Sequence, residues 1–131
     1  MEVPGNLRYA PTHEWIAVEG NLVTIGITEF AVEQLSDLVF IELPKVGESL
    51  TQGDPFGEIE STKTVSDLNT PAGGEVVEVN TEVLEDLDLI KDSPYNSGWL
   101  IRIRVDDVSK IGDLLGPQDY EKLLETEREH G

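Results

Sequence analysis

The chain has 131 residues, of which 27 are acidic and 9 basic, giving a formal net charge of −18 at pH 7. Such a surface repels phosphate backbones and anionic lipids, so we expect neither nucleic acid nor a membrane surface as a partner. Leu, Ile, Val and Phe account for 40 residues, enough to build one hydrophobic core, and we expect a single domain over residues 1–131.

The residue types needed for metal or hydrolytic chemistry are scarce. The chain has no cysteine, which excludes disulfides, thiolate metal sites and a cysteine nucleophile. Its two histidines are His13 and His130, and His130 stands next to the end of the chain. A histidine metal site or a Ser-His-Asp triad would therefore rest on His13 alone, so we expect no metal site. No stretch has the roughly 20 apolar residues of a membrane span, and the N-terminus has no signal-peptide pattern.

Apolar residues alternate with polar ones from about residue 14 to residue 105. This period of two, broken by Gly, Pro, Asn and Asp at turn spacing, predicts antiparallel β structure. Two runs alternate clearly: Val23, Ile25 and Ile27, and then Trp99, Ile101, Ile103 and Val105. Further strands are expected at residues 14–18, 39–43, 56–61, 64–68 and 74–80.

Helices are expected in two places. The first covers residues 28–35, with Thr28 as its N-cap and Glu29 at its positive end. The second is the C-terminal region, about residues 107–129, where Gly116-Pro117 ends one helix and begins the next. The expected architecture is mainly β: an antiparallel sandwich or flattened barrel over residues 7–105, with short peripheral and C-terminal helices.

Lys63 stands out by its charge and by its position. It lies between two expected strands, where a two-residue hairpin turn would project its side chain into water. From residue 46 to residue 90 it is the only base among eleven acids, so a basic partner could find this lysine by the surrounding field. Position alone favours a solubilising turn residue, because short patterns produce many false positives.

The residues around Lys63 form a wider pattern. In order, they are Gly47, Gly53-Asp54, Glu60-Ser61-Thr62-Lys63-Thr64, Pro71, Gly73-Gly74 and Val76 to Val79. This pattern resembles lipoyl and biotinyl carrier domains, whose modified lysine sits at the tip of a hairpin. Biotinyl domains usually flank that lysine with methionines, whereas Thr62 and Thr64 stand here, which favours the lipoyl type.

Further segments extend this resemblance to one family. They are Thr12-His13-Glu14-Trp15, Gly26-Ile27-Thr28-Glu29-Phe30-Ala31, Asp37-Leu38-Val39-Phe40-Ile41-Glu42-Leu43-Pro44, Glu60 to Leu68, and Gly98-Trp99-Leu100. Their order over residues 7–105 resembles the glycine cleavage H proteins. Two positions depart from that pattern: Asn69 replaces a common aromatic residue, and Ser93-Pro94-Tyr95-Asn96 replaces the usual Asp-Pro-Tyr-Gly.

The resemblance implies a barrel-sandwich hybrid fold and a non-catalytic carrier with lipoic acid amide-linked to Lys63. Such a carrier takes an aminomethyl group from the pyridoxal-phosphate glycine decarboxylase (the P protein) to a tetrahydrofolate-dependent aminomethyltransferase (the T protein). Dihydrolipoamide dehydrogenase (the L protein) then reoxidises the arm, and lipoylating enzymes attach it. We expect a monomer in the bacterial cytoplasm, or in the mitochondrial matrix if a transit peptide has been removed.

Glu14 and Asp67 are the candidates for sheltering the loaded arm. A carboxylate would hold the cationic amine by a charge-assisted hydrogen bond, and the resemblance places the segment of Glu14 beside the lysine-bearing hairpin. Both residues equally fit ordinary surface acids. We expect His13 to pack or to satisfy a backbone group, and Trp15 and Trp99 to anchor the core.

Two other functions remain open at this level. A small hydrolase could use Glu14 and Asp67 as an acid/base pair, although the chain shows no nucleophile motif. A carrier of the same kind could instead serve lipoate relay or another lipoyl-dependent pathway.

Overall fold

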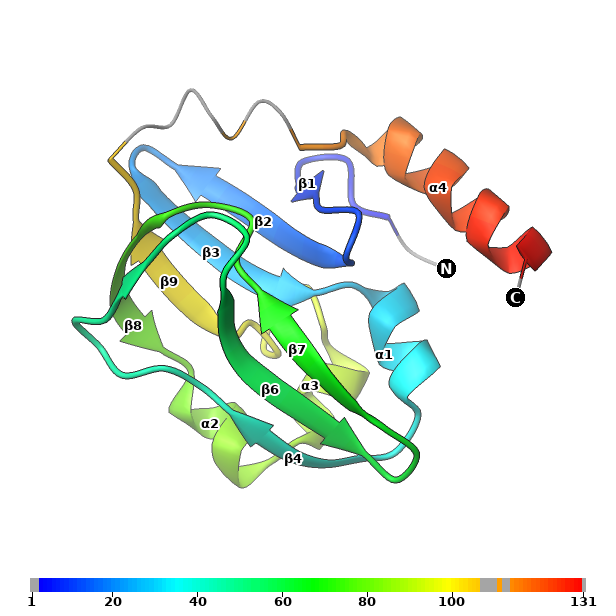
Figure 1. Cartoon of the computed structure of the whole chain (residues 1–131), viewed down its shortest axis with the longest axis horizontal. Coiled ribbons are helices and arrows are strands. Elements are labelled where there is room, and N and C mark those ends of the chain that lie inside the picture. The colour runs from blue at the N-terminus through cyan, green and yellow to red at the C-terminus, as the bar shows by residue number, and fades with distance from the viewer. Residues whose placement is uncertain (1–2, 107–110, 112–113, 131) are drawn as a thin grey trace.

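Two antiparallel sheets face each other in the computed structural model (Figure 1). The structure describes residues 3–106, 111 and 114–130, and of residues 128–130 it describes the backbone alone. The larger sheet has six strands in the order β1-β2-β3-β9-β8-β5, and the smaller has three in the order β4-β6-β7. The strands are β1 (Arg8–Tyr9), β2 (Glu14–Glu19), β3 (Leu22–Ile27), β4 (Leu38–Glu42), β5 (Ser49–Leu50), β6 (Pro55–Ser61), β7 (Val65–Asn69), β8 (Gly74–Val79) and β9 (Ile101–Arg104). The prediction of a mainly β sandwich is confirmed.

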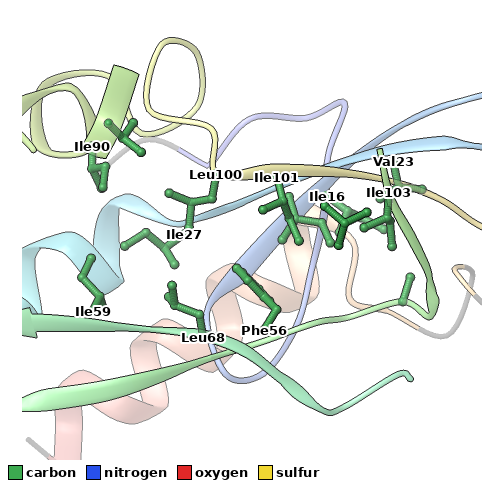
Figure 2. Packing of buried hydrophobic residues seen from close by; sticks show 14 of the residues in the cluster. Ile16, Val23, Ile27, Phe56, Ile59, Leu68, Ile90, Leu100, Ile101 and Ile103 are labelled. Atoms are coloured by element: carbon green, nitrogen blue, oxygen red, sulfur yellow. The ribbon is translucent and has the colours of Figure 1, made fainter. Parts of the chain in front are cut away.

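The alternating residues of both sheets meet in one apolar layer (Figure 2). Ile16, Ile25 and Ile101 contribute from the larger sheet, and Ile59 and Leu68 from the smaller; each is at most 2% exposed. Because side chains alternate along a strand, burying this set turns the charged residues of the same strands toward water.

The helices lie around the sandwich. They are α1 (Glu29–Leu35), α2 (Thr81–Glu85), α3 (Asp88–Asp92) and α4 (Pro117–His130). The predicted cap of α1 is confirmed, because the Thr28 side chain accepts a hydrogen bond from the backbone N–H of Ala31, 3.3 Å away.

The C-terminal helix covers a second apolar cluster beside β1. Tyr120 and Leu124 of α4 pack there with Tyr9, Trp15 and Phe30, and the rings of Tyr9 and Tyr120 stack with centroids 4.5 Å apart. The start of α4 at Pro117 agrees with the prediction. The preceding helix, expected from about residue 107, falls mostly outside the described residues, and Leu115 at its end forms an antiparallel bridge with Tyr9 instead.

Several short elements have no clear signal in the sequence. Strands β1 and β5 have two residues each, and helices α2 and α3 have five, too few to show a period. The expectation for Trp15 is confirmed at 2% exposure. Trp99 is only partly buried: it packs against the second apolar cluster, and its ring also carries the guanidinium of Arg102, 4.0 Å from the ring centroid. The long Arg102 side chain thus covers a face of Trp99 that we had placed in the core.

Candidate functional site

Lys63 lies in the turn that joins β6 to β7, and its side chain is exposed. The last paired residues of the hairpin are Glu60 and Val65, so the connection is slightly longer than the two-residue turn we predicted. The turn between β6 and β7 therefore places Lys63 outside both sheets.

Hydrogen bonds donated by backbone N–H groups, two of them to a side-chain hydroxyl, hold the turn while the lysine side chain extends from it. The Ser61 hydroxyl oxygen accepts from the backbone N–H groups of Lys63 and Thr64, each 3.2 Å away. The backbone N–H of Thr62 donates to the carbonyl of Asp37 after α1, at 3.0 Å. The turn that carries Lys63 is therefore held from two sides.

The solvent face of the small sheet is strongly acidic. Glu42, Glu58 and Asp67 stand directly opposite one another on β4, β6 and β7, and all three are exposed. Like charges at paired positions repel and destabilise a sheet. A partner that presents basic groups would relieve this repulsion.

Exposed apolar side chains lie in the next row, close to the Lys63 turn. Glu60 of β6 is flanked by Phe40 on one side and Val65 on the other, which are 47% and 55% exposed. The surface around Lys63 thus combines carboxylates with two apolar side chains.

Glu14 differs from the other acids whose side chains the structure describes because it is buried, with only 2% of its surface exposed. Its carboxylate accepts hydrogen bonds from the Thr12 hydroxyl and from the backbone N–H of Asn69, the latter at 3.4 Å. Burial raises the pKa of Glu14 to about 7, and these hydrogen bonds oppose the rise. Near neutral pH this carboxyl group is balanced between its two protonation states.

The positions of Glu14 and Asp67 relative to the hairpin are distinct. Glu14 contacts β7 at Asn69, the end far from Lys63, whereas Asp67 lies two residues earlier on β7, on the exposed acidic face. The four residue steps from Val65 to Asn69 span about 13 Å. Both carboxylates therefore lie along one strand that starts beside the lysine.

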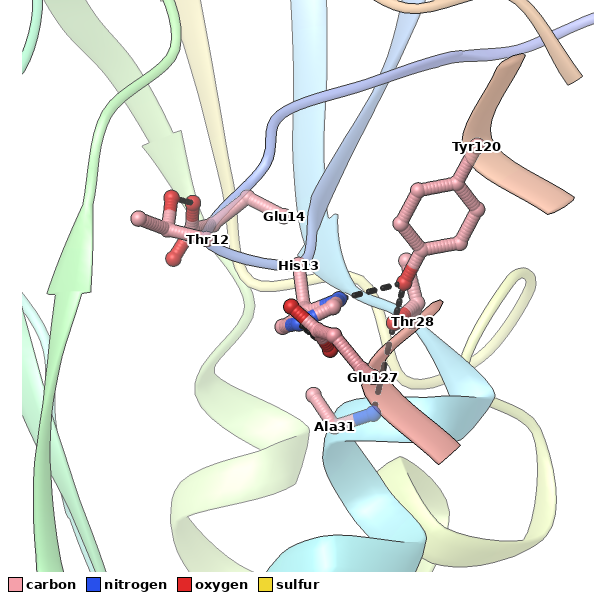
Figure 3. A network of polar contacts seen from close by, with 7 residues as sticks. All are labelled: Thr12, His13, Glu14, Thr28, Ala31, Tyr120 and Glu127. Atoms are coloured by element: carbon pink, nitrogen blue, oxygen red, sulfur yellow. Dashed lines mark hydrogen bonds and ion pairs between the residues drawn. The ribbon is translucent and has the colours of Figure 1, made fainter. Parts of the chain in front are cut away.

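His13 faces α4 (Figure 3). Its Nδ1 lies 2.8 Å from the Tyr120 hydroxyl and its Nε2 lies 2.8 Å from a carboxylate oxygen of Glu127. The expectation that it packs is confirmed by Phe30, whose ring centroid is 4.7 Å away, but its polar partners are side chains rather than the backbone.

Sequence reasoning missed the residues that support the candidates. Ser61 and Thr12 were within two residues of a candidate, and their hydroxyls were a usable signal. Asn69, Tyr120 and Glu127 are 55, 107 and 114 positions away from their partners Glu14 and His13, so no local pattern could connect them.

Two further searches cover only the described part of the chain. Within it, no group of three or more His, Cys, Asp or Glu side chains could hold a metal ion. None of the helices described there is long and apolar enough to cross a membrane.

Comparison with known proteins identifies the family. The model of the family "Glycine cleavage H-protein" matches residues 7–127. The chain belongs to this family. It is thus a non-catalytic lipoyl carrier of the glycine cleavage system, which rules out the small hydrolase weighed above.

Individual members of the H-protein family are similar over nearly their whole length. The glycine cleavage system H protein of Carboxydothermus hydrogenoformans is 51% identical over 127 residues, covering 97% of this chain and 98% of that protein. The H protein of Trichormus variabilis is 49% identical with the same coverage. The crystal structure of an H protein from Mycobacterium marinum superposes with a TM-score of 0.83 at 46% identity, covering 90% of this chain and 95% of that one.

Proposed function

We propose that Lys63 is the residue to which lipoic acid is amide-linked in this carrier. The observation that carries the proposal is its exposed position in a turn whose backbone is held by Ser61 and Asp37. A modifying enzyme can reach the amine there, and both sheets stay intact when it does. The family carries a lipoyl group, and this geometry fits such a group.

The arm that results would be long enough for its task. A lysine side chain extended by lipoic acid reaches on the order of 14 Å from the backbone. A lipoyl group held by Lys63 would supply the disulfide and dithiol chemistry by which the aminomethyl group passes from the P protein to the T protein and by which the L protein restores the disulfide. The contribution of the chain is to hold the attachment point in the Ser61 turn and to present the acidic face to these partners and to lipoylating enzymes.

Glu14 and Asp67 are our candidates for residues that hold the cationic amine carried by the arm. Glu14 lies along β7 at a distance from the turn comparable to the reach of the arm. A cationic amine close to Glu14 would favour its ionised form and lower its pKa from about 7. The buried carboxyl group would then become charged when it has an amine to bind. Asp67 is exposed, so water screens its attraction more strongly.

We further propose that the chain acts as a single-domain monomer in a bacterial cytoplasm. One apolar cluster includes residues of both sheets, which supports a single folding unit, and the relatives described above are bacterial proteins.

The attachment site is tested by peptide mapping. The purified chain is incubated with a lipoylating enzyme, digested, and analysed by mass spectrometry. We expect the lipoyl group on Lys63 alone among the five lysines. Its presence on Lys45, Lys91, Lys110 or Lys122 in place of Lys63 would refute the proposal.

A further inference from the structure

The residue before Glu14 has a strained backbone. His13 has φ 75°, one of two positive values among the described non-glycine residues, in a region that such residues rarely adopt unless their surroundings hold them there. Its backbone is tied on both sides: its N–H donates to the carbonyl of Ala10 at 2.9 Å, and its carbonyl accepts from the N–H of Thr28 at 3.0 Å. The direction of the chain at His13 sets where Thr12 and Glu14 point.

Two side chains of the C-terminal helix contact the His13 ring. Tyr120 and Glu127 contact its two ring nitrogens, and they lie seven residues apart, about two turns along one face of α4. A single helix face therefore engages both ends of the imidazole.

The polar groups form one directional chain of hydrogen bonds (Figure 3). Burial lowers the pKa of His13, which favours a neutral ring whose Nε2–H donates to Glu127 and whose Nδ1 accepts from the Tyr120 hydroxyl. Burial raises the pKa of Tyr120, so this hydroxyl keeps its proton. Its oxygen also lies 2.7 Å from Thr28 Oγ1 and can accept from that hydroxyl.

This chain connects α4 to two segments near the candidate arm site. Through His13 it reaches the turn that carries Thr12 and Glu14, and through Thr28 it reaches the N-cap of α1. The Tyr120 hydroxyl is the atom shared by both connections. Removing it would leave the His13 ring nitrogen and the Thr28 hydroxyl without this partner.

We propose that α4 positions the arm-holding carboxylate: Tyr120 and Glu127 hold His13 in its left-handed conformation, and His13 thereby aims Thr12 and Glu14 at the end of β7. The inference rests on the proposed role of Glu14 in holding the amine. Tyr120, Glu127 and His13 are positioning residues, because they act through the backbone and through Thr12 and do not touch the arm.

The first test measures Glu14 directly in the unlipoylated chain. Its carboxyl carbon is titrated by ¹³C NMR in wild type, in Tyr120→Phe, which keeps the ring stack on Tyr9, and in the control Thr126→Ala, whose hydroxyl donates to the Lys122 carbonyl within α4. We expect a pKa near 7 in wild type and control, and a value at least one unit lower in Tyr120→Phe, because Glu14 then gains access to water. Resonances of His13, Tyr95 and Glu127, the titratable groups around this hydroxyl, are followed in the same titration.

A second pair of variants tests the backbone conformation. His13→Ala and His13→Asn both remove the ring, but asparagine adopts the left-handed conformation more readily. We expect the pKa of Glu14 to fall in His13→Ala and to be partly restored in His13→Asn. This pair also serves if Tyr120→Phe does not fold. An unchanged pKa in every folded variant, or equal falls in His13→Ala and His13→Asn, would overturn the inference.

The third test separates the inference from the proposed function. Loss of the aminomethyl group from the loaded arm is followed by mass spectrometry in Glu14→Gln, Tyr120→Phe and the double variant. We expect each single variant to lose the group several-fold faster, and the double variant to be no faster than Glu14→Gln. Equal acceleration by Tyr120→Phe in both backgrounds would overturn the inference. No effect of Glu14→Gln, together with a shifted pKa in Tyr120→Phe, would refute the role of Glu14 while supporting its positioning by α4.

Discussion

The carboxylate of Glu14 accepts a hydrogen bond from the backbone N–H of Asn69 across a distance of 3.4 Å. This contact joins β2 of the larger sheet to β7 of the smaller one, and it places a buried acid of β2 against the strand that follows Lys63. Its consequences for stability and for carrier function can be measured separately.

Stability should depend on the ionisation of Glu14. Its pKa is about 7 in the folded chain against 4.5 for an ordinary glutamate, so between these values the folded state binds more protons than the unfolded state. The free energy of unfolding therefore falls as pH rises from 4.5 to about 7, by about 3 kcal/mol in total, because each pH unit in this window costs about 1.4 kcal/mol. Below pH 4.5 the contribution is fully present, and above pH 7 it is lost.

Glu14→Gln removes this titration, so the measurement is a comparison of the two chains. Urea unfolding at pH 5 and at pH 8 should show that wild type loses up to about 3 kcal/mol more than the variant between the two conditions. The many other acids are common to both chains and cancel in the difference. Parallel pH profiles would show that Glu14 ionises normally in the folded protein.

Glu14 and Asp67 should differ in how strongly each slows the loss of the aminomethyl group from the arm. Replacing Glu14 with Gln should leave lipoylation unchanged but speed loss of the aminomethyl group, because a neutral amide attracts a cationic amine less strongly than a carboxylate does. Asp67→Asn should have a smaller effect, since Asp67 is exposed and screened by water. The rate of mass loss from the loaded arm measures both, and a larger effect for Asp67→Asn would reverse the assignment.

Lys63→Arg should abolish carrier function and leave the fold intact. Arginine keeps the positive charge among the acids but stays protonated and cannot accept the lipoyl group. An exposed turn residue changes the free energy of unfolding by no more than about 0.5 kcal/mol. Thermal unfolding and glycine–bicarbonate exchange with the reconstituted decarboxylase are measured after treatment with lipoylating enzyme. Exchange retained by the variant would refute the role of Lys63, and a large fall in Tm would reveal a structural role for it.

Ser61→Ala should loosen the turn that holds Lys63. The Ser61 hydroxyl oxygen accepts from two backbone N–H groups, and losing these bonds costs about 1 kcal/mol. We expect that fall in the free energy of unfolding, together with slower lipoylation. Thr64→Val is the matched control, because the exposed Thr64 hydroxyl makes one 3.5 Å bond to the next carbonyl. Equal lipoylation rates for Ser61→Ala and wild type would show that order in the turn does not matter to the modifying enzyme.

The positions of the longer strands along the chain, the cap of α1 and the place of Lys63 between two strands were readable from the sequence by itself. Each depends on local physics: apolar residues alternate along a strand, and Thr28 needs only the N–H three residues later. The two-residue strands β1 and β5 and the five-residue helices α2 and α3 were not predicted, since such segments are too short to show a period and are held by their neighbours in space.

Only the tertiary structure decided what surrounds the candidate residues. Glu14 and Asp67 are both acids near predicted strands, but one is buried against Asn69 and the other is exposed opposite Glu58. The tyrosine and glutamate that hold His13 come from a helix more than 100 positions away along the chain. Burial and hydrogen bonding set a pKa and fix a side chain, and both depend on which distant segments meet when the two sheets and α4 pack together.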